Sequence, residues 1–237
     1  METIETNKNK IIIKEKINES LINAIRRYVN EIPVLAIDEV EISKNDSALY
    51  DETLAHRMGL IPIISKKINE KTSGELTLDI KKEGIVYSGD LQGNINLVYD
   101  NIPITLLNKG QEIKLIAKVK AGKGSEHSKF SPGILFYRNV VDIKINNDCP
   151  EEVIKMCPLS VFELKENKVL AKHSEKCDMC NVCLEICSKY KKDSITITPK
   201  DELIITIESF GQMDVKDIFT NSVSILKKDL EDIEKSL

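Results

Sequence analysis

The sequence predicts an α+β protein with helices near its two ends, a β-rich middle and a separate small unit that carries all of its cysteines. Three observations support this prediction. Apolar residues recur at helical spacing in residues 17–28 and again after residue 214. Between these segments, apolar residues alternate with polar ones as in half-buried strands, and glycines mark the turns. All six cysteines lie between Cys149 and Cys187.

The N-terminal part predicts a short strand followed by a helix. Residues 11–16 are expected to form the strand, and the apolar pattern becomes helical over residues 17–28. Asn18 or Ser20 can cap the start of this helix, and Pro33 prevents its continuation.

A second, shorter helix is expected over residues 51–58. Acidic residues at its start suit the helix dipole, and Gly59 is placed to end it. Residues 121–133 contain three glycines and a proline and are expected to form a loop. Alternating apolar residues predict further strands within residues 39–42, 76–80, 113–119 and 203–207.

The C-terminal stretch from Asp214 is expected to be one long helix. Its apolar residues are spaced three and four positions apart up to Leu237, and charged residues occupy the other side. A narrow stripe with a period of about 3.5 residues usually packs against another helix. It is also compatible with packing on the core of its own domain, and composition does not decide between the two.

The bulk composition argues for protein partners. The 237 residues suffice for two or three small units. The net charge of −4 lacks the basic excess of a dedicated nucleic-acid binder, so we expect no direct sequence-specific DNA binding. No apolar run approaches the roughly 20 residues of a membrane span, and none near the start is typical of a signal peptide. We therefore expect a cytoplasmic protein.

The cysteines predict one iron–sulfur cluster. Residues 177–187 read CDMCNVCLEIC, which is C-x2-C-x2-C-x3-C, and a Cys-Pro pair stands at 157–158. Three thiolates at this spacing on a tight loop bind three corners of a cubane cluster, and a remote cysteine, often followed by proline, binds the fourth. We expect a 4Fe–4S cluster, or a 3Fe–4S cluster if one corner is lost. The expected ligands are Cys157, Cys177, Cys180 and Cys183.

A second cluster is not expected. In two-cluster ferredoxins the last cysteine of each run binds the other cluster. A second cluster here would need Cys187 and three cysteines before Cys157, at positions that hold Asn147, Pro150 and Val153. Cys149 and Cys187 are then left over, either as a disulfide or as two buried thiols in a reducing compartment.

Zinc is the competing metal. A structural zinc ion usually takes two well-separated C-x2-C or Cys/His pairs, and one triad plus a remote Cys-Pro fits that pattern less well. His173 is near enough in sequence to be considered as a ligand, but a lone histidine is more often a surface residue. The spacing therefore favours iron and sulfide.

Four further segments stand out in order along the chain. They are NAIRRYVNEIPVLAIDEVEI (23–42), DETLAHRMGLIPI (51–63), GKGSEHSKFSPG (122–133) and SFGQMDVKDIF (209–219). The first two resemble the signature of the archaeal D subunit of RNA polymerase, and also the eukaryotic third-largest subunit and, more remotely, the bacterial alpha N-terminal domain. The other two are similar to the family's insert loop and C-terminal return. The resemblance covers nearly the whole chain.

The resemblance implies three domains and a set of partners. An alpha-like dimerisation domain would comprise residues 1–45 and 202–237, a β-rich insert domain 46–145, and a ferredoxin-like cluster-binding insert 146–201. The chain would form a heterodimer with subunit L, dock subunits N and P, and seed assembly of the large catalytic subunits. The paired arginines of the first helix match the family's and are either solvent-facing or in contact with a large subunit. The residues expected at partner interfaces are Leu21, Ile25, Arg26, Arg27, Val223, Leu226, Leu230 and Ile233.

Two functions are compatible with these features. The first is a non-catalytic assembly platform of RNA polymerase. No catalytic residue is expected, because nucleotidyl transfer needs clustered carboxylates that hold magnesium and the acidic residues here are scattered among lysines. The alternative is a ferredoxin-like electron-transfer protein or reductase subunit. Only about a quarter of the chain supports it, and no glycine-rich nucleotide fingerprint is present.

Overall fold

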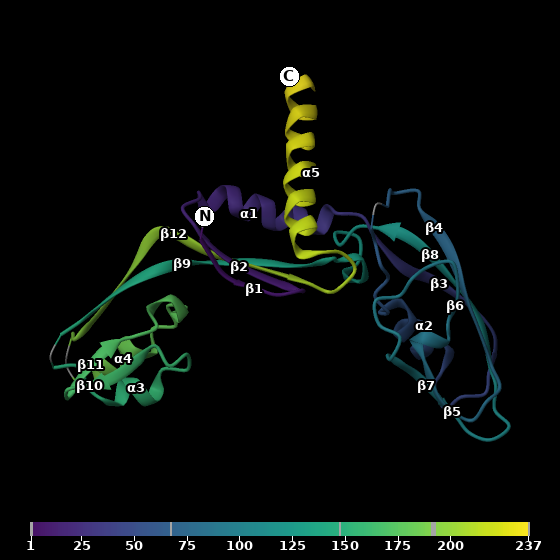
Figure 1. Cartoon of the computed structure of the whole chain (residues 1–237), viewed down its shortest axis with the longest axis horizontal. Coiled ribbons are helices and arrows are strands. Elements are labelled where there is room, and N and C mark those ends of the chain that lie inside the picture. Colours follow the sequence, from purple (N-terminus) through teal and green to yellow (C-terminus); the bar gives the residue numbers. More distant parts are fainter. Residues whose placement is uncertain (1, 67, 147, 191–192, 237) are drawn as a thin grey trace. The chain divides into compact units, whose positions relative to one another are not determined.

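The computed structural model describes residues 2–66, 68–146, 148–190 and 193–236 (Figure 1). Contacts between residues divide the chain into two units. The first comprises Met1–Glu5, Ile12–Ile22 and Phe136–Thr206, and the second comprises Thr6–Ile11, Asn23–Leu135 and Ile207–Leu237. The three predicted domains have other boundaries and stay a prediction. The α+β class is confirmed.

One four-stranded sheet has the order β1-β2-β12-β9, and each of its strands contributes residues to both units. Its members are β1 (Glu2–Thr6), β2 (Lys10–Glu15), β9 (Gly133–Ile145) and β12 (Ile195–Ser209). The strands predicted at 11–16 and 203–207 are confirmed by β2 and β12. Leu203–Ile207 is buried at every position rather than at every second one, so both faces of β12 are covered there.

The second unit contains a β-rich part around a helix. An antiparallel sheet of order β3-β8-β4-β6 consists of β3 (Val34–Asn45), β8 (Ile113–Gly122), β4 (Ser73–Ile80) and β6 (Gln92–Gly93). A two-stranded sheet pairs β5 (Gly84–Tyr87) with β7 (Pro103–Leu107), and η2 (Ser88–Asp90) follows β5. The helix α2 (Asp51–Gly59) confirms the helix predicted at 51–58, and Leu60 follows it.

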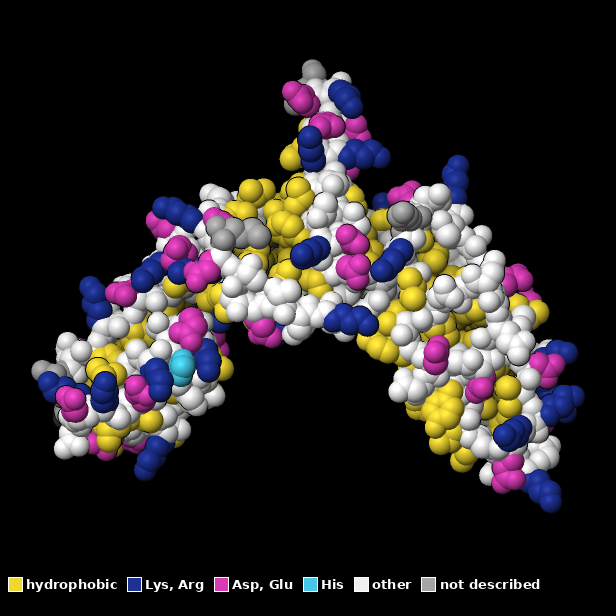
Figure 2. Space-filling view, in the orientation of Figure 1, with side chains coloured by type: hydrophobic (Ala, Val, Ile, Leu, Met, Phe, Trp, Pro, Cys, Tyr) yellow, Lys and Arg dark blue, Asp and Glu magenta, His cyan; other side chains and the backbone are white. Residues whose placement is uncertain are grey.

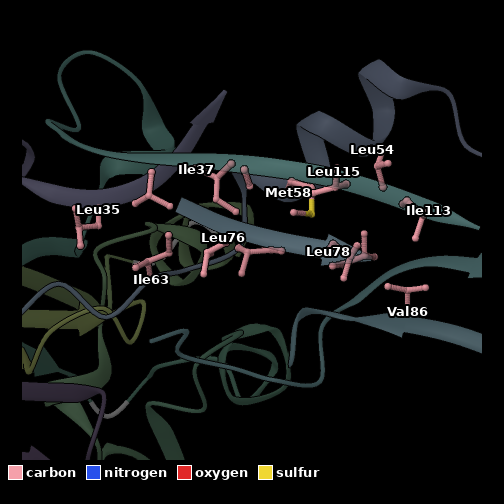
Figure 3. Close-up of a cluster of buried hydrophobic side chains, with 14 of the residues drawn as sticks. Leu35, Ile37, Leu54, Met58, Ile63, Leu76, Leu78, Val86, Ile113 and Leu115 are labelled. Carbon is pink, nitrogen blue, oxygen red and sulfur yellow. The ribbon is translucent and has the colours of Figure 1, made fainter. Parts of the chain in front are cut away.

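The core of this part lies between α2 and the strands (Figure 3). Leu54 and Met58 are the buried face of α2, and they meet Leu35 and Ile37 of β3 and the alternating residues of β4 and β8. The alternation in 76–80 and 113–119 is therefore the inward-facing set of two half-buried strands. The loop predicted at 121–133 begins two residues later, after β8 ends at Gly122, and holds η3 (Ser128–Phe130).

Two helices carry the predicted apolar faces near the chain ends. The first, α1 (Glu19–Tyr28), is followed by η1 (Val29–Glu31), and Asn18 Oδ1 accepts a hydrogen bond of 2.8 Å from the Ser20 amide at its start. The second is α5 (Val215–Ser236), which contacts η1. No helix in the described ranges is long and apolar enough to cross a membrane.

The cysteines of the first unit lie on a small arrangement of helices and a hairpin. It consists of α3 (Glu152–Met156), the antiparallel strands β10 (Phe162–Lys165) and β11 (Lys168–Ala171), η4 (Ser174–Lys176) and α4 (Val182–Lys189). Cys177, Cys183 and Cys187 belong to its buried core, together with apolar residues of β9 and β10. The cysteines are thus core residues of this unit as well as candidate ligands.

Candidate functional site

The four predicted cluster ligands line one pocket of the first unit. Cys157 follows α3, Cys177 follows η4, Cys180 lies in the loop, and Cys183 is in the first turn of α4. The structure therefore brings together residues that are up to 26 positions apart in the chain. The remaining lining residues are mostly apolar: Leu159, Val161, Phe162, Asp178, Asn181, Val182 and Ile197.

The loop between these cysteines has a tight backbone conformation. Met179 and Asn181 have φ angles of 58° and 63°, so the backbone turns back on itself between successive cysteines. The Asp178 carboxylate accepts a hydrogen bond of 3.2 Å from the Cys180 amide and holds the turn. A tight loop of this kind lets three thiols, with two residues between each and the next, reach one pocket.

Backbone amides point at the sulfurs of this pocket. The Val161 N–H donates to Cys157 Sγ at 3.5 Å. The backbone amides near Cys177 and Cys183, at Met179 and Leu184, lower the pKa of these thiols against the larger effect of burial. Such N–H···S bonds stabilise negative charge on sulfur and help to set the properties of iron–sulfur clusters. The donor set therefore fits a cluster bound by thiolates.

Burial favours the neutral thiol form of these cysteines in the chain alone. It raises the pKa of Cys177, and it raises the pKa of Cys183 to about 11. Because only the thiolate binds metal, loading of this site must release protons, and its affinity for iron must rise with pH.

A zinc ion and a cluster make different demands on the four thiols. Among the described residues, no three or more His, Cys, Asp or Glu side chains gather closely enough to hold one ion. Four thiolates around one zinc would each lie about 2.3 Å from it, whereas each cysteine of a cubane binds a different iron, so its sulfurs lie farther apart. His173 is not among the pocket residues, and its ring nitrogen lies 3.2 Å from Glu175.

Cys149 and Cys187 are a second pair of thiols outside this pocket. Both are free thiols, and Cys187 is near enough to Cys149 to affect its ionisation. Burial first, and then the nearby Cys187, raise the pKa of Cys149 to about 12. The two side chains are thus neighbours, and a disulfide between them stays a prediction. Asn147, one of the three positions that lack a ligand for a second cluster, lies outside the described residues.

Under a mild oxidant, we expect the Cys149–Cys187 disulfide to form faster as the pH rises. The attacking species is the thiolate, and below its pKa the thiolate fraction of a thiol rises about tenfold per pH unit. Burial keeps the Cys149 thiol protonated near neutral pH, so the reaction should be slow there. Alkylation followed by mass spectrometry measures the rate, and a rate that does not change with pH would contradict this expectation.

The residues predicted at partner interfaces differ in exposure. Leu21 of α1 is 48% exposed, whereas Ile25 is buried within the chain. Arg26 and Arg27 are exposed, and the Arg26 guanidinium bonds Asn23 Oδ1 at 3.0 and 3.1 Å. Solvent-facing charge is therefore their state in this chain.

The apolar stripe of α5 does not face the core of its own chain. The buried residues of this helix are Val215, Ile218 and Ser222, which lie on another side. Leu230 and Ile233 are 58% and 56% exposed. Val223 is also exposed, Leu226 is half-buried, and Leu237 lies outside the described residues. Figure 2 shows hydrophobic side chains on one side of α5 and charged side chains around its end.

A polar contact holds the other side of α5 to the first helix. The Asp229 carboxylate near the Tyr28 hydroxyl raises the pKa of Tyr28. The side of α5 that contacts its own chain is thus not the apolar stripe, and most of the stripe is exposed to solvent. This is the arrangement of a helix that packs against another chain.

Some residues of the cluster pocket could not be predicted from the cysteine motif. Leu159, Phe162 and Ile197 line the pocket, and Val161 supplies an amide, but they come from segments outside the motif. Leu159, Val161 and Phe162 are close to Cys157 in the sequence, whereas Ile197 lies in β12 and is far from every cysteine of the site except through the fold.

Comparison with known proteins defines the class first. Residues 40–136 match the family model described as the RNA polymerase Rpb3/RpoA insert domain, which corresponds to the β-rich part of the second unit. The class is that of RNA polymerase subunits with this insert.

Curated relatives then extend the match over the whole chain. A DNA-directed RNA polymerase subunit Rpo3 of Methanosphaera stadtmanae is 32% identical over 94% of this chain and 92% of its own length. An Rpo3 of Archaeoglobus fulgidus is 30% identical over 96% and 93%. The DNA-directed RNA polymerase II subunit rpb3 of Dictyostelium discoideum is 31% identical over 99% and 93%. The chain belongs to the Rpo3/Rpb3 family of DNA-directed RNA polymerase subunits, and the family resemblance seen in the sequence is confirmed.

Proposed function

We propose that this chain is a non-catalytic assembly subunit of DNA-dependent RNA polymerase that pairs with subunit L through α1 and α5. The observation that carries this proposal is the exposed apolar stripe of α5 on a chain of the Rpo3/Rpb3 family. Leu230 and Ile233 would be buried on pairing, and Leu21 of α1 would be covered as well. The pair then receives subunits N and P and the large catalytic subunits.

The carboxylates of the chain support a role without catalysis. Those near lysines form ion pairs, as in the exposed pairs of Lys44 with Glu112 and of Lys227 with Glu231. Family membership does not favour the alternative in which the whole chain is an electron carrier.

We further propose that Cys157, Cys177, Cys180 and Cys183 hold one iron–sulfur cluster of the 4Fe–4S type. When bound, the cluster would supply four metal–thiolate bonds that join α3, the 177–183 loop and α4. The chain's own residues support these ligands: the Val161 amide donates to Cys157 Sγ, the amides of Met179 and Leu184 favour the thiolates of Cys177 and Cys183, and Leu159 and Phe162 line the pocket. A small unit gains stability from such a centre.

We test the assembly role by co-expression with subunit L. The two chains should elute together at equal stoichiometry, and addition of N, P and the large subunits should give a larger complex that requires both. If the chain elutes alone at all concentrations, it does not pair through these helices. Anaerobic purification with a visible spectrum, iron and sulfide content tests the cluster separately.

The chain alone is expected to show no template-directed RNA synthesis. Nucleotidyl transfer requires magnesium held by converging carboxylates, and among the described residues no such group of three is present. Incorporation of labelled nucleotides by the purified chain, compared with the complete polymerase, measures this. Synthesis by the chain alone above the level of a mock purification would contradict the proposal.

A further inference from the structure

Arg138 reaches the cluster-binding loop from another segment of the chain. It lies on β9 and is half-buried, and its Nη1 donates a hydrogen bond of 2.9 Å to the carbonyl oxygen of Cys177. Further along β9, Val141 is buried in the core of the cysteine unit and Ile143 packs against it. The strand is therefore fixed to the same core as the loop, and the guanidinium is held in place.

The presence of arginine rather than lysine at position 138 is informative. The chain has 34 lysines and arginines, of which only Arg26, Arg27, Arg57 and Arg138 are arginines. Arginine keeps its charge at all ordinary pH values and presents a planar set of donors that loses less freedom per hydrogen bond than lysine. In the described parts of the chain, no carboxylate forms an ion pair with Arg138, so its charge is not neutralised there.

The loop that Arg138 contacts carries an acidic group on each side of Cys177, and Lys176 lies between them. Asp178 lines the pocket and bonds the Cys180 amide, and Glu175 lies in η4, just before the first ligand of the loop. Four thiolates add further negative charge when a cluster is bound. A half-buried guanidinium beside the first ligand is a counter-charge for this region, and electrostatic effects are stronger where water is partly excluded.

We propose that Arg138 is a positioning and tuning residue for the cluster. The hydrogen bond to the Cys177 carbonyl fixes the start of the loop, and the positive charge stabilises the reduced, more negative state of the cluster. The net charge near a cluster is one of the factors that set its reduction potential. This inference rests on the proposed cluster.

The test uses the anaerobically purified full chain and three variants. Arg138→Gln keeps a donor but removes the charge, and Arg138→Lys keeps the charge but loses the planar fork. Arg57→Gln is the matched control, because Arg57 Nη2 also donates to a backbone carbonyl, that of Pro103 at 2.5 Å, within the other unit. The measurements are the reduction potential of the cluster and the rate of iron loss to a chelator.

These measurements should distinguish the effect of the Arg138 charge from the effect of its hydrogen bond. Arg138→Gln should shift the potential to more negative values, whereas Arg138→Lys should keep it close to that of the parent chain. Arg138→Lys should lose iron about tenfold faster, as expected for loss of a hydrogen bond from a charged donor. Arg57→Gln should change neither quantity.

Two results would overturn the inference, and they differ from each other. If the parent chain binds iron and sulfide and Arg138→Gln has the same potential as Arg57→Gln, the tuning role is wrong and the cluster stands. If the parent chain takes up neither iron nor sulfide, both the proposed cluster and the inference about Arg138 are wrong. Circular dichroism of each variant shows whether the fold is kept, and because Arg138→Lys retains the charge, its potential remains informative even if the loop is loosened.

Discussion

Leu230→Asp is expected to abolish pairing with subunit L while leaving the chain alone folded. Leu230 is 58% exposed on α5, so an aspartate there stays hydrated in the single chain. Pairing would bury that carboxylate without a partner, and an uncompensated buried charge costs enough to weaken binding more than about a hundredfold. Titration of the purified chain with subunit L, followed by calorimetry, measures the loss.

Ser224→Asp is the matched control for this variant. Ser224 is an exposed residue of the same helix, and its position in the helical repeat lies away from the apolar stripe. The two variants add the same charge to the same helix, so only the face differs. Leu226→Asp should also abolish pairing, but Leu226 is half-buried, so this variant should lower the thermal stability of the chain alone as well.

Pairing of Leu230→Asp at full stoichiometry and affinity would place the interface elsewhere. Equal loss in Leu230→Asp and Ser224→Asp would point to a general effect of charge rather than to the stripe. Thermal unfolding of both single chains separates these results from misfolding, because neither side chain belongs to the buried set of α5.

The sequence predicted the elements better than the way in which they pack. The spacing of residues 219–237 indicated a helix with an apolar stripe, and α5 confirms the helix. The residues that pack on the chain's own core are instead Val215, Ile218 and Ser222, which lie in about the first two turns of the helix. A pattern of apolar residues predicts that a face will be buried, but not by which chain.

The alternation of apolar and polar residues likewise predicted some of the strands and not others. It predicted β4 and β8, which are half-buried, because their side chains point alternately to the core and to solvent. It predicted only part of β12, where Leu203–Ile207 is buried throughout. The strands β1 and β9 were not predicted. All of β1 is exposed, and the burial along β9 is irregular, so neither shows a period of two.

The spacing of the cysteines predicted the four candidate ligands but not the other residues of the site. The C-x2-C-x2-C run and the remote Cys-Pro indicated four cysteines, and these four line one pocket. Amides and lining residues follow from the tertiary arrangement, as the Val161 amide and Ile197 show, and no motif contains them. The left-handed conformation of Met179 and Asn181 is likewise a property of the folded loop.

Cys183→Ser is expected to abolish the cluster, whereas Cys187→Ser should retain it. Both residues lie on α4, one turn apart, and both are buried, at 7% and 2% exposure. Only Cys183 lines the pocket with the other three predicted ligands, while Cys187 lies outside it, near Cys149. Iron and sulfide content should therefore fall to near zero in the first variant and stay at about four per chain in the second.

The two variants are well matched because each replaces a buried sulfur by a hydroxyl in the same helix. The cost of burying a hydroxyl is similar for both, so a difference in iron content reports ligation and not folding. The midpoint of thermal unfolding should also fall further for Cys183→Ser, since the metal–thiolate bonds that join α3, the loop and α4 are lost with the cluster. Loss of iron in Cys187→Ser with retention in Cys183→Ser would make Cys187 a ligand in place of Cys183. If the parent chain contained zinc and no sulfide, the site would hold a single zinc ion instead of a cluster. The four thiols would then have to move closer together when the ion binds.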